Sequence, residues 1–205
     1  TSLGAGLYTA TVTDANGCTA EASTTLTAPD PIALSTTGTD ILCHGGTTGA
    51  VDLGVAGGSG TYTFAWGGPG AFTSATEDLS GLIAGTYIVN ASDANGCSAS
   101  TSINLIQPTP ITPTAAITAA QCQGANSGAI DLGVSGGTGA YTFLWSGFPA
   151  YSATTEDITS LFAGVYTVTI TDAAGCTATA YYNVGEPGQF QIAAQLSNTS
   201  GGYNV

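Results

Sequence analysis

Lysine and arginine are absent from this chain of 205 residues, whereas aspartate and glutamate together number 13. No salt bridge to either cation can form within the chain, and its formal net charge is −13. Nucleic-acid binding needs cationic side chains that neutralise phosphates, anionic membrane surfaces attract polybasic segments, and a phosphate-binding loop needs a lysine. The composition therefore excludes nucleic acid, anionic membrane surfaces and phosphate-loop chemistry.

Long apolar runs are missing as well. The longest, such as residues 82–89, are interrupted by Gly or Thr and fall short of the roughly 20 residues of a spanning helix, so we expect no membrane insertion. The chain has neither an initiator Met nor a leader, and its start in the middle of a repeat favours a cut within a longer protein at Thr1. Charged residues make up only 6% of the chain, so hydroxyl and amide groups hydrate the surface. Copies of such a protein repel one another only weakly, which suits a protein whose copies pack side by side.

What the chain does contain is an internal repeat with a period of 79 residues. The following sets recur at this spacing: Cys18, Cys97 and Cys176; Cys43 and Cys122; Trp66 and Trp145; Pro29, Pro108 and Pro187; Tyr8, Tyr87 and Tyr166. Agreement without gaps indicates one folding unit copied whole. We therefore divide the chain into the C-terminal part of a truncated repeat (residues 1–28), two complete repeats (29–107 and 108–186) and the first strand of a further repeat (187–205).

Each repeat carries the pattern of an antiparallel β-sandwich. Apolar and small or hydroxyl residues alternate along residues 50–55 and 61–66, and most clearly along residues 166–171, which read Tyr-Thr-Val-Thr-Ile-Thr. This period of two is typical of strands with one buried face. Glycine-rich residues 57–60 and the Asp-Ala-Asn-Gly run at 93–96 are turn signals. Short strands at regular spacing between such turns predict a sandwich.

Two segments depart from the strand pattern. Residues 76–79 and their copy, residues 155–158, place acids after a threonine, which predicts a single helical turn that crosses between the sheets. The prolines at residues 29 and 31, and again at 108 and 110, predict stiff extended joints between repeats.

The ordered motifs of one repeat resemble a known family. They are Cys-His-Gly-Gly at 43–46, Gly-Ala-Val-Asp-Leu at 49–53, Gly-Gly-Ser-Gly-Thr-Tyr at 57–62, Trp66, Leu-Ile-Ala-Gly-Thr-Tyr at 82–87 and Asp-Ala-Asn-Gly-Cys at 93–97. This series resembles the SprB-type repeat of large secreted surface proteins of the Bacteroidetes, among them a gliding-motility adhesin. The resemblance implies tandem immunoglobulin-like β-sandwiches, export to the cell surface, and adhesion or surface structure. The second copy departs at residues 122–125, which read Cys-Gln-Gly-Ala, and at 172–175, which lack the Asn.

The five cysteines predict disulfides formed outside the cytoplasm. Two pairings fit the spacing. Bonds within a repeat would join Cys43 to Cys97 and Cys122 to Cys176, whereas bonds across the joint would join Cys18 to Cys43 and Cys97 to Cys122. We favour the pairing within a repeat, because an even number of strand passes would return both cysteines to one end of the sandwich. Cys18 would then have no partner in this chain.

Catalytic candidates are few. His44 is the only histidine, and its counterpart in the second complete repeat is Gln123. We therefore interpret His44 as a turn residue and not as the general base that would activate a nucleophile. Glu77 and Asp78 are the candidates for a glycosidase carboxylate pair. As neighbours in sequence, however, they cannot easily face each other across a glycosidic bond. We expect no enzyme activity and no cofactor.

Binding candidates remain. Asp93, in a run that echoes part of a calcium loop, and Asp30, Asp40 and Glu186 near the joints are weak candidates for Ca²⁺. An Asx turn explains Asp93 without a metal. The two copies differ most at residues 67–73 and 146–152, so Phe72, Phe148 and Tyr151 are the candidate ligand-loop residues. Trp66 and Trp145 share a face with phenylalanines, which predicts a core position and not a sugar-stacking platform.

These observations lead to one functional expectation and one alternative. We expect a structural and adhesive segment of a long extracellular repeat protein or filament on a bacterial surface, whose partners are further copies of itself or continuing chain. The alternative is a binding module in which loops at one end of each sandwich hold a surface glycan or Ca²⁺.

Overall fold

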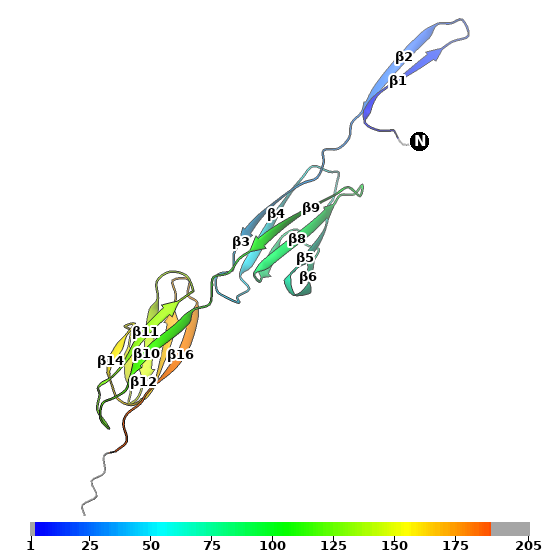
Figure 1. Cartoon of the computed structure of the whole chain (residues 1–205). Coiled ribbons are helices and arrows are strands. Elements are labelled where there is room, and N and C mark those ends of the chain that lie inside the picture. The colour runs from blue at the N-terminus through cyan, green and yellow to red at the C-terminus, as the bar shows by residue number, and fades with distance from the viewer. Residues whose placement is uncertain (1–2, 190–205) are drawn as a thin grey trace, which may run out of the picture. The chain divides into compact units, whose positions relative to one another are not determined.

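The computed structural model describes residues 3–189, and the expected first strand of a further repeat (187–205) lies almost entirely outside these residues. The chain forms two compact units, Thr1–Gln107 and Pro108–Val205. Within the described residues, each unit contains one β-sandwich, and the first also contains an antiparallel hairpin of β1 (Gly6–Thr13) and β2 (Thr19–Leu26). Figure 1 labels these elements along the chain.

The sandwich of the first unit consists of a three-stranded and a four-stranded sheet. The first has the order β3 (Ala33–Thr39), β4 (Gly49–Ala56), β7 (Leu79–Leu82), and the second has the order β6 (Phe72–Ser74), β5 (Thr63–Gly68), β8 (Gly85–Ser92), β9 (Ser98–Leu105). All pairs are antiparallel, and a 3₁₀ turn, η1 (Pro69–Ala71), links β5 to β6. Neighbouring strands in each sheet are thus joined by hairpins or by crossings to the facing sheet.

The sandwich of the second unit repeats this topology. Its sheets have the orders β10 (Thr112–Thr118), β11 (Gly128–Ser135), β14 (Ile158–Leu161) and β13 (Tyr151–Ala153), β12 (Thr142–Gly147), β15 (Gly164–Thr171), β16 (Thr177–Val184). The bulge where β4 meets β7, at Gly49, recurs at Gly128 where β11 meets β14. The two sequence copies therefore have the same fold, including the position of the β-bulge.

The strand order is that of an immunoglobulin-like sandwich. With β3 to β9 taken as strands A, B, C, C′, E, F and G, the sheets read A-B-E and C′-C-F-G. The hydroxyl of Tyr87, near the start of β8, donates a hydrogen bond to the carbonyl oxygen of Ile83 at 3.0 Å, and Tyr166 does the same to Phe162 at 3.0 Å. This is the tyrosine corner at the E–F connection of such folds. The predicted fold class, all-β with tandem immunoglobulin-like repeats, is confirmed.

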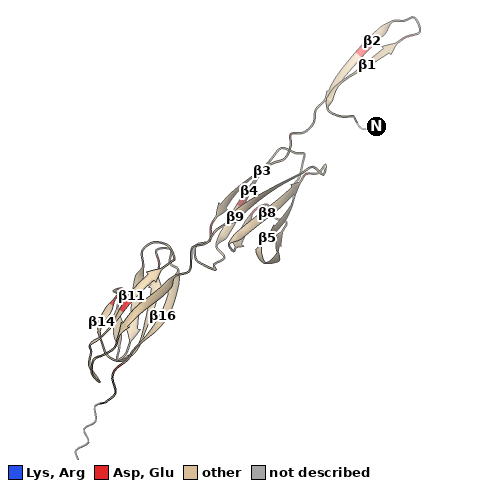
Figure 2. Ribbon diagram, viewed as in Figure 1, with Lys and Arg blue, Asp and Glu red and all other residues tan. Residues whose placement is uncertain are grey.

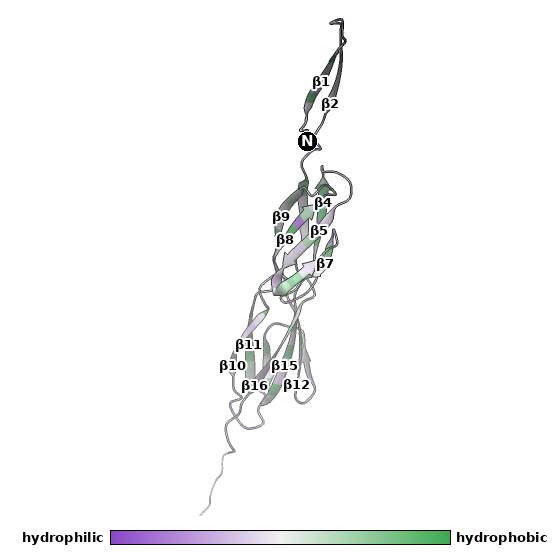
Figure 3. Cartoon of the chain, turned by 90° about the vertical axis from the view of Figure 1, so that its right-hand side faces the viewer, coloured by the Kyte–Doolittle hydropathy of each residue, from purple (hydrophilic) through white to green (hydrophobic). Residues whose placement is uncertain are grey.

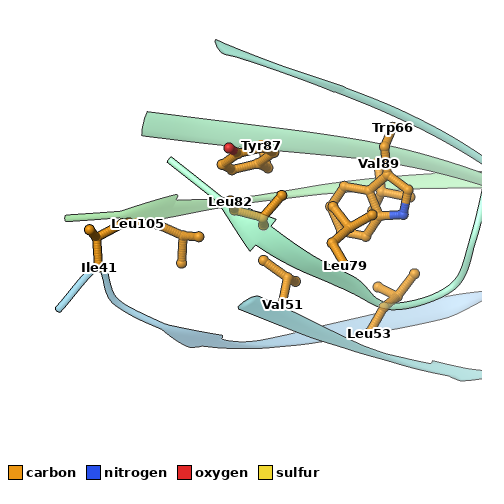
Figure 4. Packing of buried hydrophobic residues seen from close by; sticks show 9 residues of the cluster. All are labelled: Ile41, Val51, Leu53, Trp66, Leu79, Leu82, Tyr87, Val89 and Leu105. Atoms are coloured by element: carbon orange, nitrogen blue, oxygen red, sulfur yellow. The ribbon is translucent and has the colours of Figure 1, made fainter. Parts of the chain in front are cut away.

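One face of each sheet supplies the core between the sheets. In the first sandwich the buried cluster is Ile41, Val51, Leu53, Trp66, Leu79, Leu82, Tyr87, Val89 and Leu105. Figure 4 shows Ile41 and Leu105 at one end of this cluster and Trp66 beside Leu79 and Val89 toward the other. Trp66 and Trp145 are both buried, so their predicted core position is confirmed.

The outer strand faces carry hydroxyls and few charges. Along β15, buried residues alternate with partly exposed threonines, and Figure 3 shows hydrophobic and more hydrophilic residues following one another along the strands. Figure 2 shows isolated acidic residues on the ribbon and no blue residue. Threonine suits this position because its branched side chain favours strand geometry while its hydroxyl remains hydrated.

The predicted helical turn at residues 76–79 and 155–158 is wrong. Both segments are bends that lead into β7 and β14. In the first, Asp78 Oδ1 accepts a hydrogen bond from the backbone N–H of Leu53 at 3.0 Å, and the carbonyl oxygen of Thr76 accepts one from the indole of Trp66 at 2.9 Å. The threonine and the acid thus bind groups that are distant in sequence, where the pattern predicted local capping.

The hairpin of β1 and β2 is the copy of β8 and β9 without its facing sheet. The residues on β8 whose side chains fill the core correspond to Tyr8, Ala10 and Val12. Val12 is 69% exposed, whereas its counterpart Ala91 is 0% exposed. The face of the hairpin that corresponds to the core face of β8 is therefore exposed at Val12.

Candidate functional site

Hydrogen-bonded polar side chains close turns at both ends of each sandwich. At one end of the second sandwich, Asp172 is only 5% exposed. Its Oδ1 accepts hydrogen bonds from the N–H groups of Ala174 and Cys176, both at 2.9 Å, and its Oδ2 accepts one from Thr138 at 2.8 Å. The carboxylate therefore ties the turn between β15 and β16 to the glycine-rich loop at residues 136–139.

Burial by itself would raise the pKa of Asp172, but the hydrogen bonds from the N–H groups of Cys176, Thr138, Ala174 and Gly175 outweigh it and hold the pKa below its ordinary value. Asp93 has the same partners in the first sandwich, accepting from Asn95 and Cys97 at 2.9 Å and from Ser59 at 3.0 Å. Such a carboxylate closes a turn, and its lone pairs are already used by N–H donors.

The opposite end of each sandwich carries the turn that begins at the first cysteine of the repeat. In the first sandwich, Gly46 N–H donates to the carbonyl oxygen of Cys43 at 2.9 Å, and Gly45 N–H donates to Gln107 Oε1 at 2.7 Å. In the second, Gly124 N–H donates to Glu186 Oε2 at 2.7 Å. The last residues of each repeat thus hold its first-cysteine turn.

The candidate calcium residues do not converge. Asp40 Oδ1 accepts a hydrogen bond from Ile106 N–H at 2.8 Å, at the end that carries Gln107, while Asp93 lies at the other end near Asp30. Glu186 holds the turn of the second sandwich. Among residues 3–189 no group of three or more His, Cys, Asp and Glu side chains is placed to hold a metal ion.

The cysteines do not follow the predicted pairings. Cys43 and Cys176 are disulfide-bonded, whereas Cys18, Cys97 and Cys122 are exposed free thiols. The pairing within a repeat is wrong because five strands, β4 to β8, separate Cys43 from Cys97. An odd number of passes leaves the two cysteines at opposite ends of the sandwich. The alternative across the joint also fails, since Cys97, Cys122 and Cys18 are all free.

The count of strand passes was the error in the pairing. The three strands with clear alternation, β4, β5 and β8, already make an odd number, and the short strands β6 and β7 in facing sheets add two more without changing the parity. Cys43 lies beside Gln107, whereas the turn that ends at Cys97 contacts the loop at residues 57–60, which is held by the carbonyl oxygen of Asp30.

The candidate ligand-loop residues occupy two kinds of position. Phe72 packs edge-to-face on Tyr87 and Tyr151 packs in the same way on Tyr166, with ring centroids 5.4 Å apart in both pairs. Burial raises the pKa of the Tyr151 hydroxyl. Phe148, in contrast, is 63% exposed and corresponds to Pro69 in the first sandwich. Of the three residues, Phe148 presents the ring that a ligand could reach.

No arrangement for nucleophilic catalysis is found among the described residues. His44 adjoins Cys43, whose sulfur is in a disulfide and is therefore no thiolate nucleophile. Asp78 is bound to the backbone of Leu53, as Asp157 is to that of Leu132 at 2.9 Å. These acids stabilise the fold. Over the same part of the chain, no helix has the length and apolar character needed to cross a membrane.

Comparison with known families agrees with the motif series. The SprB repeat family matches residues 35–71 and 114–148, one region in each sandwich. Both matches start at the equivalent residue and cover the first three strands of the sandwich, β3 to β5 in the first and β10 to β12 in the second. The resemblance to the SprB repeat that was inferred from the sequence is therefore confirmed in both sandwiches. No curated protein matches the chain.

Solved structures with immunoglobulin domains are similar to the chain at low identity. The amphioxus IgVJ-C2 molecule is 16% identical, with a TM-score of 0.31, over 62% of this chain and 90% of that one. The N-terminal eight Ig domains of Down Syndrome Cell Adhesion Molecule are 12% identical, with a TM-score of 0.45, over 89% of this chain and 28% of that one. The immunoglobulin-like assignment rests on the strand order and the tyrosine corners.

Proposed function

We propose that this chain is a structural and adhesive segment of a long extracellular repeat protein on a bacterial surface. The observation that carries the proposal is the equivalence of the two SprB repeats at both ends of the sandwich. Asp93 and Asp172 close the same turn, and Gln107 and Glu186 hold the same opposite turn. In each sandwich these polar groups stabilise the sandwich's own turns, and both sandwiches have the same contacts. This is what we expect of a structural repeat in a tandem array.

The location outside the cytoplasm is supported by two further properties. Disulfides persist in oxidising compartments and are rare in the cytosol, and two cysteines of the chain are disulfide-bonded. A surface that lacks Lys and Arg offers no cleavage site to trypsin-like proteases. Both properties suit a protein that works outside the cell, with continuing chain or further copies of itself as its partners.

Surface labelling tests this proposal. Antibodies raised against residues 29–186 should label intact cells of the source bacterium without permeabilisation, and deletion of the coding region should remove the label and weaken attachment to surfaces. A cytoplasmic control protein should remain unlabelled in the same cells. Labelling that requires permeabilisation would contradict the proposal.

A second candidate function, glycan binding, is favoured by the exposed ring of Phe148. An aromatic ring at a loop can stack on a sugar. If this ring binds glycan, Phe148→Ser should abolish retention on a glycan array, whereas Tyr181→Ser, which changes another exposed aromatic residue on the outer face of β16, should not. Equal retention of both variants and the parent would exclude this use of Phe148.

A further inference from the structure

The outer face of the four-stranded sheet in the second sandwich carries a patch of exposed apolar side chains. Leu144 on β12, Val165 on β15 and Tyr181 on β16 are all more than half exposed. Leu144 is paired with Thr169, and Tyr181 is paired with Thr167, on the two sides of β15. Because residues two apart on a strand share a face, the three apolar side chains lie around two threonines on one face of the sheet.

The fold does not require these apolar side chains. In the first sandwich the same positions hold Ala65, Thr86 and Ser102, although the two sandwiches have the same strand order. On β5, β8 and β9, which the structure describes in full, Ile88 is the only exposed large hydrophobic residue. The patch is therefore particular to the second sandwich, and a contiguous exposed apolar patch marks an interaction surface.

The distribution of charge restricts what can cover this face. The strands of the sheet, β12, β13, β15 and β16, contain no charged residue, whereas the facing sheet exposes Asp131 on β11. The other acids of residues 108–186 lie in turns and connections, at Glu156, Asp157, Asp172 and Glu186. A cationic partner would be attracted to those acids and would gain nothing from this face.

A second copy of the chain fits the same restriction. The chain has a formal net charge of −13 and no Lys or Arg, so two copies repel wherever their acids meet and can pack closely only through faces without acids. Sheet faces also pack well against one another. Four strands about 4.8 Å apart, with up to eight residues at ~3.3 Å each, give a face of about 500 Å². Two such faces would bury about 1,000 Å² in total, the size of a weak and reversible interface.

We propose that the outer face of β12, β15 and β16 in the second sandwich binds the same face of a second copy of the chain. The contact is isologous, so it uses the same face on both copies and closes at a dimer. The inference rests on the proposed function in one respect: it names the surface through which further copies of the chain, the partners expected there, meet.

Sedimentation equilibrium of the full chain tests the contact, with the exposed thiols alkylated so that no disulfide forms between copies. We expect a monomer–dimer equilibrium that strengthens as salt is added, because screening weakens the repulsion between the net charges. The triple variant Leu144→Ala, Val165→Thr, Tyr181→Ser should raise the dissociation constant about tenfold or more. It should fold, because the first sandwich has these residues at the same positions.

The matched control is Phe148→Ser, which removes an exposed ring from a loop outside the face and should dimerise as the parent does. A parent chain that stays monomeric, or a triple variant that dimerises as strongly as the parent, would overturn the proposal. So would a monomeric parent that is retained on a glycan array when the triple variant is not, since the face would then bind a neutral sugar. Labelling of intact cells, which tests the proposed function, is independent of all these outcomes.

Discussion

The backbone N–H of Cys176 donates a hydrogen bond to Asp172 Oδ1 at 2.9 Å. The same relationship joins Cys97 to Asp93 in the first sandwich, also at 2.9 Å. A single acid therefore orients the turn that presents the second cysteine of each repeat. We expect this acid to stabilise the sandwich and to position the cysteine.

Replacement of Asp172 by Ala should destabilise the second sandwich and leave the first unchanged. The change leaves the N–H groups of Cys176, Ala174 and Thr138 without their acceptor, and buried donors without partners are costly. Chemical denaturation should show a lower midpoint for one of two transitions. Asp131→Ala, at an exposed acid on β11, is the matched control and should unfold as the parent does.

Acidification should destabilise the second sandwich through the same carboxylate. The pKa of Asp172 in the folded chain lies below its ordinary value of 3.8, so the ionised form is the one that folding favours. This stabilisation is fully present above the ordinary pKa and is lost as the pH falls through the lower, folded pKa. Stability measured between pH 6 and about pH 2 should fall steeply below about pH 4, and Asp172→Asn should flatten that fall. An unchanged slope in the variant would contradict this role.

Loss of the buried indole should affect one sandwich only. Trp145→Ala is expected to cost its own sandwich about 3 to 5 kcal/mol, the usual effect of removing a buried aromatic side chain. The cores of the two sandwiches are separate clusters, so the first should unfold as before. Denaturation curves followed by tryptophan fluorescence measure the unfolding of both sandwiches. Native emission that is already typical of water-exposed tryptophan would refute the core position.

The tyrosine corner offers a matched pair of changes. Tyr87→Phe removes the hydrogen bond to Ile83 inside a folded sandwich and should cost about 1 kcal/mol. Tyr8→Phe removes the equivalent bond to Gly4, at 2.8 Å in the exposed hairpin, and should leave the denaturation of both sandwiches unchanged. Equal effects of the two changes would show that the corner acts independently of the sandwich.

Trypsin should leave the chain intact under native and denaturing conditions alike. The sequence has no Lys or Arg, so even the unfolded chain offers no site. A protease that cuts after aromatic residues serves as the positive control and should cleave the denatured chain. Tryptic fragments with ends inside the sequence would show that the residues differ from those given.

The sandwich could be predicted because the sequence signals for its strands are local and occur in each repeat. The alternation at residues 166–171 marks β15, and the interval of 79 residues defines the folding unit. The bends at residues 76–79 could not be predicted in the same way. Asp78 binds the N–H of Leu53, 25 residues earlier, and a threonine followed by acids looks the same whether it caps a helix or binds a distant strand.

The disulfide partners could not be predicted from local patterns in the same way. The end of the sandwich at which a cysteine lies follows from whether the number of strands between the two cysteines of a repeat is even or odd, and that number is odd with or without the short strands β6 and β7. The sequence does contain one signal of the immunoglobulin-like topology. Tyr8, Tyr87 and Tyr166 recur shortly before the Asp-containing turns, which is typical of the tyrosine corner of an immunoglobulin-like strand F.

Single-molecule extension of the chain, held at its two ends in reducing buffer, tests most directly whether it is a structural array of independent sandwiches. Reduction is required because Cys43 and Cys176 are disulfide-bonded, and a disulfide shields the residues that it encloses from the applied force. We predict two separate unfolding events of equal size, each releasing roughly 240 Å of chain, the extended length of one repeat less its folded length. Smooth extension without such events, or one event that releases both repeats together, would contradict the account.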